Sequence, residues 1–463
     1  MNRLLAAFLV AAAVLSAANE VRLPRYTREV LSNGIVLDVI PRAEVPLTSI
    51  RVVLRGGSEA DPPELGGLSA VTADALRRGT AKRSADQFSN ELDSLGASYA
   101  QQVSPQSTVV NIELLSKDLE KGLDLMLDSL LNATFPAAEI QKLLAQRIDG
   151  SKALKDNGGA AVAEYYRTFY FGANHPYGRP VDEISQAKIT RDAIVAAHKK
   201  MYVGRNMIVL VAGDVNANTA ATVRKALAGI AAGSPWQWQK AALPVSAGPR
   251  MAIIDKADAS ETQFRIGLPG IDRTNPDRVP LWLVNTLFGG RFTSVLNEAL
   301  RVNSGLSYGA NSQVEQNHLQ GRISISSFTA TQNTVKAVNL ALEVLKGIAE
   351  KGITAEQLAS AKAYVKGTYP ADRLETANQL AEIVGDIELF DLNRGEVDDL
   401  FPRIDSVTVE KANEMIRKYL RPQNLTFVLL GNASKFPPGL EALGVKAPVK
   451  VAITEPGIRV TAE

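Results

Sequence analysis

One stretch of the chain occurs twice and decides its fold. It reads ITRDAIVAAHKKMYVGRNMIVLVAG at residues 189–213 and VTVEKANEMIRKYLRPQNLTFVLLG at residues 407–431, and the two copies align without a gap. In each copy a threonine, Thr190 or Thr408, precedes a segment whose apolar residues recur at helical spacing. A continuous apolar run that ends in glycine follows, as is typical of a buried strand. Each copy therefore predicts a helix followed by a buried strand.

Further matches extend the repeat upstream. FPAAEI at 135–140 and ITAEQL at 353–358 have the same separation along the chain as the two long copies, and both are expected to open helices. GASY at 96–99 lies opposite GLSY at 305–308. Matches in the same order indicate an internal duplication. We therefore predict an α+β protein of two tandem homologous α/β-roll halves, each with a mostly antiparallel sheet covered by helices on one face.

Strand signals in the first half agree with this plan. Residues 35–40, 49–54 and 108–114 are short runs rich in β-branched residues. The last run is expected to pair with residues 98–103 across the turn at 104–106. Between the halves lies a segment rich in glycine, proline, alanine and serine, which predicts a linker. The predicted layout is a first half at 19–232, a linker at 233–250, a second half at 251–437 and an irregular tail at 438–463.

Composition is typical of a globular protein. The chain has 463 residues, too many for one ordinary core, and 46% of them are hydrophobic and 22% charged. The formal net charge of +2 is nearly balanced, and no long run of lysine and arginine occurs. Composition therefore gives no support for a nucleic-acid partner. The absence of cysteine excludes a disulfide framework, a thiolate metal site and lipid attachment.

The first 18 residues are predicted to be a secretory signal. Arg3 supplies a positive end, residues 4–15 form an unbroken apolar run, and the small residues at 16–18 offer a cleavage site. The run is shorter than the roughly 20 residues that span a bilayer as a helix, which disfavours an uncleaved anchor. We expect an exported, soluble mature protein without stable membrane insertion, located in the periplasm if the source has two membranes.

Several short motifs together resemble a known family. They are GGL at 66–68 leading to RGT at 78–80, HPYG at 175–178, and GGRFTS at 289–294 leading to GLSY at 305–308. In this order and across the internal duplication, they resemble the inverted-zincin peptidases: pitrilysin, insulin-degrading enzyme and the mitochondrial processing peptidase subunits. The resemblance runs from about residue 31 to residue 431, and it implies the two-half fold predicted above.

The resemblance also implies where zinc would bind. Active members carry H-x-x-E-H on the helix between the GGL and RGT motifs, with a further glutamate about seventy residues downstream. Here Ala70 and Asp74 stand at the histidine positions, Ala73 stands at the glutamate, and the downstream position falls near Gly150. Methyl groups cannot coordinate zinc, and one carboxylate cannot hold the ion alone. No metal is expected in this chain.

The three histidines do not rebuild such a site. His198 falls in a predicted helix and His318 in a polar loop, while His175 belongs to the HPYG turn. We interpret all three as structural histidines, with a cryptic metal site as the less favoured alternative.

The resemblance implies a second catalytic element, an Arg and a Tyr seven residues apart, which this chain retains as Arg301 and Tyr308. Such donors stabilise the oxyanion that forms when a peptide carbonyl is attacked. The alternative is that Arg301 forms a surface ion pair and Tyr308 packs in the core. In two-chain members of the family one chain carries zinc and the other carries Arg and Tyr. The resemblance therefore implies a homologous zinc-bearing partner subunit, with zinc in the partner and no cofactor in this chain.

The resemblance also points to a peptide-binding edge. In the family the strand that corresponds to residues 98–103 binds substrate by strand addition. Ser98, Tyr99, Ala100 and Gln101 are therefore candidate substrate-binding residues, and an ordinary hairpin strand is the alternative.

The expected function is that of a non-catalytic subunit of an exported two-chain zinc peptidase, inactive alone. A structural or peptide-binding scaffold with a peptidase-like fold is the main alternative, and an independent hydrolase with unusual ligands is a third.

Overall fold

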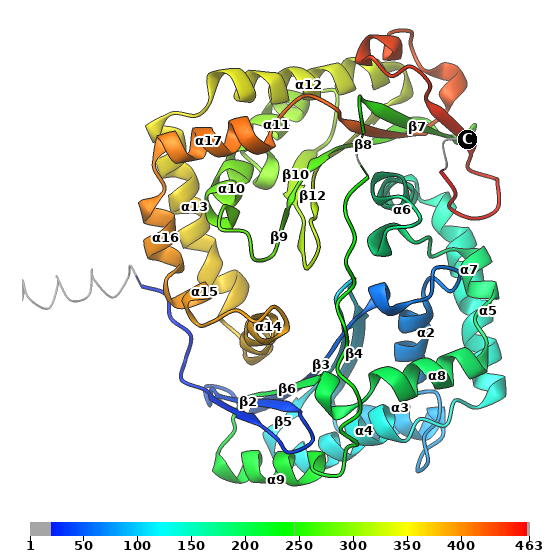
Figure 1. Cartoon of the computed structure of the whole chain (residues 1–463), viewed down its shortest axis with the longest axis vertical. Coiled ribbons are helices and arrows are strands. Elements are labelled where there is room, and N and C mark those ends of the chain that lie inside the picture. The colour runs from blue at the N-terminus through cyan, green and yellow to red at the C-terminus, as the bar shows by residue number, and fades with distance from the viewer. Residues whose placement is uncertain (1–19, 245, 461–463) are drawn as a thin grey trace, which may run out of the picture.

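A computed structural model describes residues 20–244 and 246–460 of the chain. The predicted signal segment at 1–18 lies outside the described residues. The described residues form two six-stranded sheets, one in each half, which face each other across the molecule (Figure 1). No helix in these residues is both long enough and apolar enough to cross a membrane.

The first sheet has the strand order β1-β2-β6-β3-β5-β4. Only the pairing of β2 with β6 is parallel. The strands are β1 (Thr27–Val30), β2 (Val36–Pro41), β3 (Leu47–Arg55), β4 (Ser98–Val103), β5 (Ser107–Leu115) and β6 (Met207–Gly213). The helices are α2 (Leu68–Ala75), α3 (Ala85–Ser94), α4 (Leu119–Leu131), α5 (Ala137–Ala153), α6 (Gly158–Phe171), α7 (Glu183–Ala187), α8 (Arg191–Met201) and α9 (Ala217–Leu227).

The second sheet has the order β10-β12-β8-β13-β7-β14. Its strands are β7 (Arg250–Asp255), β8 (Glu261–Pro269), β10 (Ala310–Val314), β12 (Arg322–Ala330), β13 (Thr426–Gly431) and β14 (Val449–Ala452), and β9 (Ile271–Asp272) pairs separately with β11 (Gln316–Asn317). The helices are α10 (Arg278–Asn285), α11 (Val295–Asn297), α12 (Thr334–Lys351), α13 (Ala355–Arg373), α14 (Ala377–Leu389), α15 (Gly395–Asp398), α16 (Leu400–Ser406) and α17 (Val409–Tyr419), with π-helical turns η6 (Thr286–Gly290) and η7 (Glu298–Asn303).

The predicted repeat is confirmed by the elements that it forms. The two long copies become α8 with β6 and α17 with β13, and the FPAAEI and ITAEQL matches become the starts of α5 and α13. The hydroxyls of Thr190 and Thr408 accept hydrogen bonds from the third backbone N–H of their helices, as N-caps do. Both strands are fully buried because each lies inside its sheet with both faces covered.

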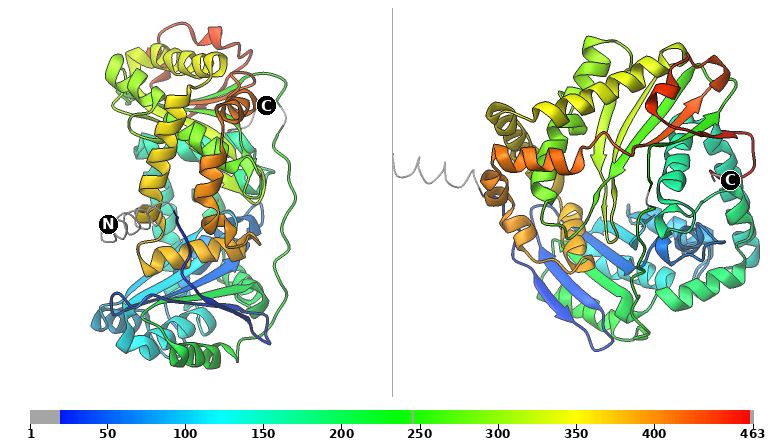
Figure 2. Two further views of the ribbon diagram at one scale, coloured as in Figure 1. Left: turned by 90° about the vertical axis from the view of Figure 1, so that its left-hand side faces the viewer. Right: turned by 45° about the horizontal axis from the view of Figure 1, so that its top comes forward.

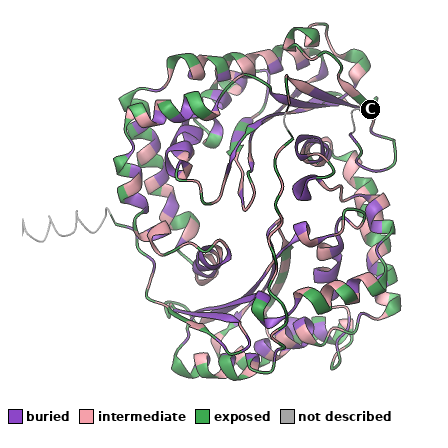
Figure 3. Cartoon of the chain, in the orientation of Figure 1, coloured by how far each residue is buried: buried purple, intermediate pink, exposed green. Residues whose placement is uncertain are grey.

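The α+β two-half fold with mostly antiparallel sheets is confirmed, and the structure adds an exchange of helices. Helix α14 of the second half packs on the first sheet against β3 and β6, and α6 of the first half packs on the second sheet against β8 and β13. In Figure 3 both helices are mostly buried, whereas the helices at the outside of the molecule expose one face. Each sheet therefore has helices of its own half on one face and one helix of the other half on the opposite face.

The described linker residues, 233–244 and 246–249, form an extended strap that contacts both halves. Figure 2 shows it running along one side of the molecule from the first sheet to the second. The Trp236 indole donates to Glu59 (2.9 Å), and the Trp238 ring stacks on His318 of the second half with 4.5 Å between ring centroids. Arg250, which we predicted to end the linker, is the first residue of β7.

The prediction of an irregular tail is wrong. Residues 449–452 form β14, which pairs in parallel with β7 and completes the second sheet. Ile458 then joins the apolar cluster around α6, and its backbone N–H donates to Asp182 of the first half (2.8 Å). The tail therefore connects the two halves.

Candidate active-site remnant and Arg–Tyr pair

Helix α2 is positioned by a carboxylate at its start. Asp61 accepts hydrogen bonds from the backbone N–H groups of Gly67 (2.9 Å) and Ser69 (2.7 Å) and from the Ser69 hydroxyl. Burial raises the pKa of Asp61 to about 6, although these hydrogen bonds oppose the rise. Gly67 begins the helix with a φ of 95°, which favours glycine. The helix then packs on β4, α5 and α8.

Three of the four positions that replace the zinc motif lie around one cavity. Ala70 and Gly150 line it directly, and Asp74 lies one helical turn beyond Ala70 beside β4. Ala73, at the position of the glutamate, is buried in the packing of the helix. The positions that the sequence assigned to the zinc motif and to the downstream ligand therefore lie close together, on α2 and α5.

An ion pair occupies the side of the cavity where ligands would be needed. Asp74 Oδ2 accepts a hydrogen bond from Arg147 of α5, and Asp74 Oδ1 accepts one from Gln101 of β4 (3.1 Å). The one carboxylate among the residues at the motif positions is thus neutralised by a guanidinium, whose positive charge opposes the binding of a cation. These residues do not fit a zinc ion. Arg147 was not singled out from the sequence, although it lies one helical turn before Gly150.

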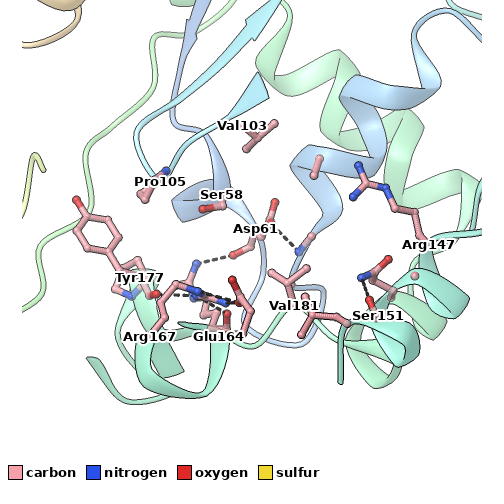
Figure 4. A pocket seen from close by; sticks show the side chains of 18 of the residues that line it. Ser58, Asp61, Val103, Pro105, Arg147, Ser151, Glu164, Arg167, Tyr177 and Val181 are labelled. Atoms are coloured by element: carbon pink, nitrogen blue, oxygen red, sulfur yellow. Dashed lines mark hydrogen bonds and ion pairs between the residues drawn. The ribbon is translucent and has the colours of Figure 1, made fainter. Parts of the chain in front are cut away.

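The cavity has a volume of about 460 Å³. In Figure 4 the Arg147 side chain reaches from α5 toward Val103, while Asp61, Glu164 and Arg167 lie on the other side. Arg167 donates to Glu164 (2.7 Å) and to the backbone carbonyl of Tyr177 (2.7 Å). Charged groups on that side are thus already paired.

The three histidines pack or form hydrogen bonds within the protein. His175 is buried, accepts a hydrogen bond at Nδ1 from the Tyr177 N–H (3.1 Å), and has a pKa lowered to about 4 by burial. His198 lies 2.7 Å from the Leu130 carbonyl through Nε2, and burial lowers its pKa. His318 stacks on Trp238. Within residues 20–244 and 246–460, no three His, Cys, Asp or Glu side chains lie together as metal ligands would.

Strand β4 is the edge of the first sheet and pairs with β5 as predicted. Ser98 and Ala100 are exposed. Tyr99 turns inward, where its hydroxyl lies 2.9 Å from the Ser129 hydroxyl, and Gln101 bonds to Asp74. The four predicted substrate-binding residues thus lie on a free edge, and two of their side chains have partners within the protein.

Arg301 and Tyr308 lie side by side on the surface of the second half. The Arg301 guanidinium lies 4.6 Å from the centre of the Tyr308 ring and 4.7 Å from that of Phe292. Tyr308 is 75% exposed and Phe292 65% exposed. Among the described residues, no carboxylate lies within ion-pair distance of Arg301, so Arg301 does not form the surface ion pair of the alternative interpretation. Because Tyr308 is exposed, it does not pack in the core as that alternative required. Tyr99, the repeat counterpart of Tyr308, is the one that packs inward.

A second cavity, of about 500 Å³, adjoins this pair. Arg301 and Phe292 line it together with Arg265 of β8 and Ser326 of β12, which are opposite each other in the sheet. Gly267, two residues after Arg265, contacts Tyr166 of α6. Because alternate strand residues share a face, the cavity lies on the same face of the sheet as α6. Arg301 lies in π-helical η7, and Tyr308 precedes β10 by two residues.

Family models account for most of the chain. The model described as insulinase (peptidase family M16) matches residues 40–170, and the model described as peptidase M16 inactive domain matches residues 188–365. The chain belongs to peptidase family M16. This confirms the resemblance to inverted zincins, of which the chain is a member without the zinc motif.

The chain is similar to two bacterial proteins over nearly their whole length. An uncharacterised zinc protease of Mycobacterium tuberculosis is 24% identical over 406 residues, which cover 87% of this chain and 92% of the relative. An uncharacterised zinc protease of Bacillus subtilis is 22% identical, over 89% of this chain and 99% of the relative.

Solved structures share the fold. A peptidase M16 inactive domain from Pseudomonas fluorescens superposes with a TM-score of 0.81 at 22% identity, covering 89% of this chain and 99% of that one. A protease from Helicobacter pylori superposes with a TM-score of 0.80 at 18% identity, covering 88% and 100%.

Proposed function

We propose that this M16 chain is the non-catalytic subunit of an exported two-chain zinc peptidase. Arg301 and Tyr308 would act in trans on a peptide held at the zinc site of a homologous H-x-x-E-H partner. The observation that carries the proposal is the exposure of this pair: Tyr308 is 75% exposed, and its ring lies 4.6 Å from the Arg301 guanidinium. The two side chains form a donor surface that is open to a second molecule.

The chemistry of the pair suits this role. A phenol O–H and a guanidinium both donate hydrogen bonds, and fixed donors aimed at a developing oxyanion lower the barrier of peptide hydrolysis. Contact with the Tyr308 and Phe292 rings restricts the Arg301 side chain, so less conformational entropy is lost when substrate binds.

The residues at the former zinc position support the assignment of zinc to a partner subunit. Asp74 is paired with Arg147 and Gln101, so this chain offers no set of ligands that could activate water. Zinc is accordingly assigned to the partner, and this chain is expected to be inactive alone. Export rests on the apolar run at residues 4–15.

The test is reconstitution with an exported M16 homologue that carries H-x-x-E-H. The two chains together should cleave peptides, with zinc recovered in the homologue and not in this chain. Arg301→Ala and Tyr308→Phe should each lower kcat about 10²-fold, because each removes one donor to the oxyanion. Arg421→Ala, at an exposed arginine after α17, is the control and should leave kcat unchanged.

Two results would count against the proposal. Wild-type kcat in both variants would reject the donor role. Peptide binding without cleavage in the presence of every such homologue would favour the scaffold alternative.

A further inference from the structure

The cavity at the former zinc position adjoins the free edge of β4. Val103, the last residue of β4, lines the cavity together with Ala70 of α2. In the described part of the chain, β4 has one neighbour in the sheet, β5. A free edge can bind an extended peptide as an added strand, and a peptide bound here would reach the cavity.

Arg147 brings unused hydrogen-bond donors into this cavity. Among the described residues only Asp74 accepts a hydrogen bond from it, through Nη2, and the side chain is 36% exposed. A guanidinium has five N–H donors, so those on Nε and Nη1 remain available. Their planar arrangement matches the two oxygens of a carboxylate.

The other charged groups of the cavity already make hydrogen bonds within the protein. Arg179 donates to the backbone carbonyls of Glu59 (2.9 Å) and Asp61, and Arg167 is paired with Glu164. The Asp61 carboxylate holds the start of α2. Arg179 Nε also lacks a partner among the described residues, but it is buried. Arg147 is therefore the lining guanidinium whose unused donors belong to a partly exposed side chain.

A buried amide in the same cavity lacks one partner. Gln186 is 3% exposed, and its Nε2 donates to the Ser151 hydroxyl (2.6 Å). Its Oε1 has no hydrogen-bond partner among the described residues. A buried polar atom without a partner is costly, so a ligand that bonds to this end of the amide would be favoured.

We infer that this cavity binds the C-terminal residue of a peptide. Arg147 holds the terminal carboxylate, the free end of the Gln186 amide bonds to the backbone of the terminal residue, and the preceding residues add to the edge of β4. The volume of about 460 Å³ lies within the range of ordinary ligand sites. At this position an active member of the family would cleave within a peptide, whereas here the Arg147 guanidinium binds the end of a peptide. The inference concerns this chain alone and does not require the zinc-bearing partner.

The test compares two forms of one probe on the purified chain. A fluorescein-labelled octapeptide library of mixed sequence, ending in a free carboxylate, should bind at least about tenfold more tightly than the same library ending in an amide, because a charge-assisted pair is lost. Arg147→Ala should abolish this difference. Asp74→Asn should enlarge it, since it removes the carboxylate that competes for Arg147.

The control is Lys152→Ala. Lys152 lies on the same helix, is 62% exposed at its side chain and pairs only with Asp149, so its loss should leave the acid-to-amide ratio unchanged. Arg147→Lys keeps the charge without the planar fork and should restore part of the preference. Equal binding of the two forms by the wild-type chain, no binding of either, or an unchanged preference in folded Arg147→Ala would overturn the inference.

Discussion

At the scale of single residues, the interface between the halves contains a carboxyl group without a partner. Asp38 lies on β2 among inward-facing residues and is fully buried, and neither of its oxygens has a hydrogen-bond partner in the described structure. Burial raises its pKa to about 7, and nearby Glu388 of α14 adds to the rise, while Arg28 opposes it. Arg28 is itself bound to Glu388 (2.8 Å). The folded protein therefore favours the protonated form of Asp38.

This gives a prediction with a definite sign. Because the pKa of Asp38 is higher in the folded chain than its ordinary value of 3.8, folding takes up a proton, and the free energy of unfolding should fall as the pH rises from about 4 to about 7. Asp38→Asn should remove that fall. Relative to the wild type, the variant should gain up to about 4 kcal/mol between pH 4 and pH 8. Urea unfolding at both pH values measures the gain, and parallel pH profiles of the two proteins would contradict the prediction.

At the scale of elements, the exchanged helices depend on close packing. Gly385 of α14 faces the first sheet, where a Cβ atom would lie 3.4 Å from Leu210 and 3.5 Å from Val53. Around this point the residues Leu380, Val384 and Ile387 of the same helix are buried. A larger side chain at Gly385 would push the helix away from the sheet, because interiors packed this densely accommodate added volume poorly.

A pair of glycine substitutions tests this packing. Gly385→Leu should lower the free energy of unfolding by about 1–3 kcal/mol through overpacking. Gly367→Ala on α13, where a Cβ atom would meet nothing within 4 Å, should raise it by about 0.5–1 kcal/mol, because alanine favours the helix. Chemical denaturation measures both. A Gly385→Leu chain as stable as the wild type would show that α14 is not held tightly on the sheet.

At the scale of the whole molecule, the halves share apolar clusters. One of them joins Tyr165 and Tyr166 of α6, from the first half, to Val428 of β13 and to Ile458 of the tail. Gly457 and Ile458 also donate through their backbone N–H groups to Glu183 (2.7 Å) and Asp182 (2.8 Å) of the first half. Because of these contacts, the exchanged helices and the linker, we expect the two halves to unfold as one cooperative unit.

The tail offers neighbouring residues for a test. Ile458 is 1% exposed, whereas Arg459 is exposed. Ile458→Ala should lower the free energy of unfolding by about 2–5 kcal/mol, because it leaves a cavity in the shared cluster. Hydrogen exchange should then rise in both α6 and β13. Arg459→Ala should stay within about 0.5 kcal/mol of the wild type. Faster exchange in only one of the two elements would contradict the expectation that the two halves unfold together.

Local patterns were sufficient for the repeated elements. The runs that become β6 and β13 are apolar except for Thr426 and end in glycine, so they predicted buried strands without knowledge of their neighbours. The β4–β5 hairpin was predicted because its strands flank a short polar turn. Strand β14 was missed, because four residues among prolines and glycines carry little signal and its partner β7 lies almost 200 residues earlier.

The sequence by itself determined the duplication, the two-half fold and the loss of the zinc motif, because each of these follows from residue identities and their order. Only the tertiary structure decided that α6 and α14 each pack on the sheet of the other half and that Arg147 neutralises Asp74. Only the tertiary structure, too, decided that Tyr308 is exposed while Tyr99 packs inward on Phe88. An apolar helix face does not specify which sheet will cover it. Contacts between groups that are distant along the chain depend on how the whole chain folds, and no local pattern records them.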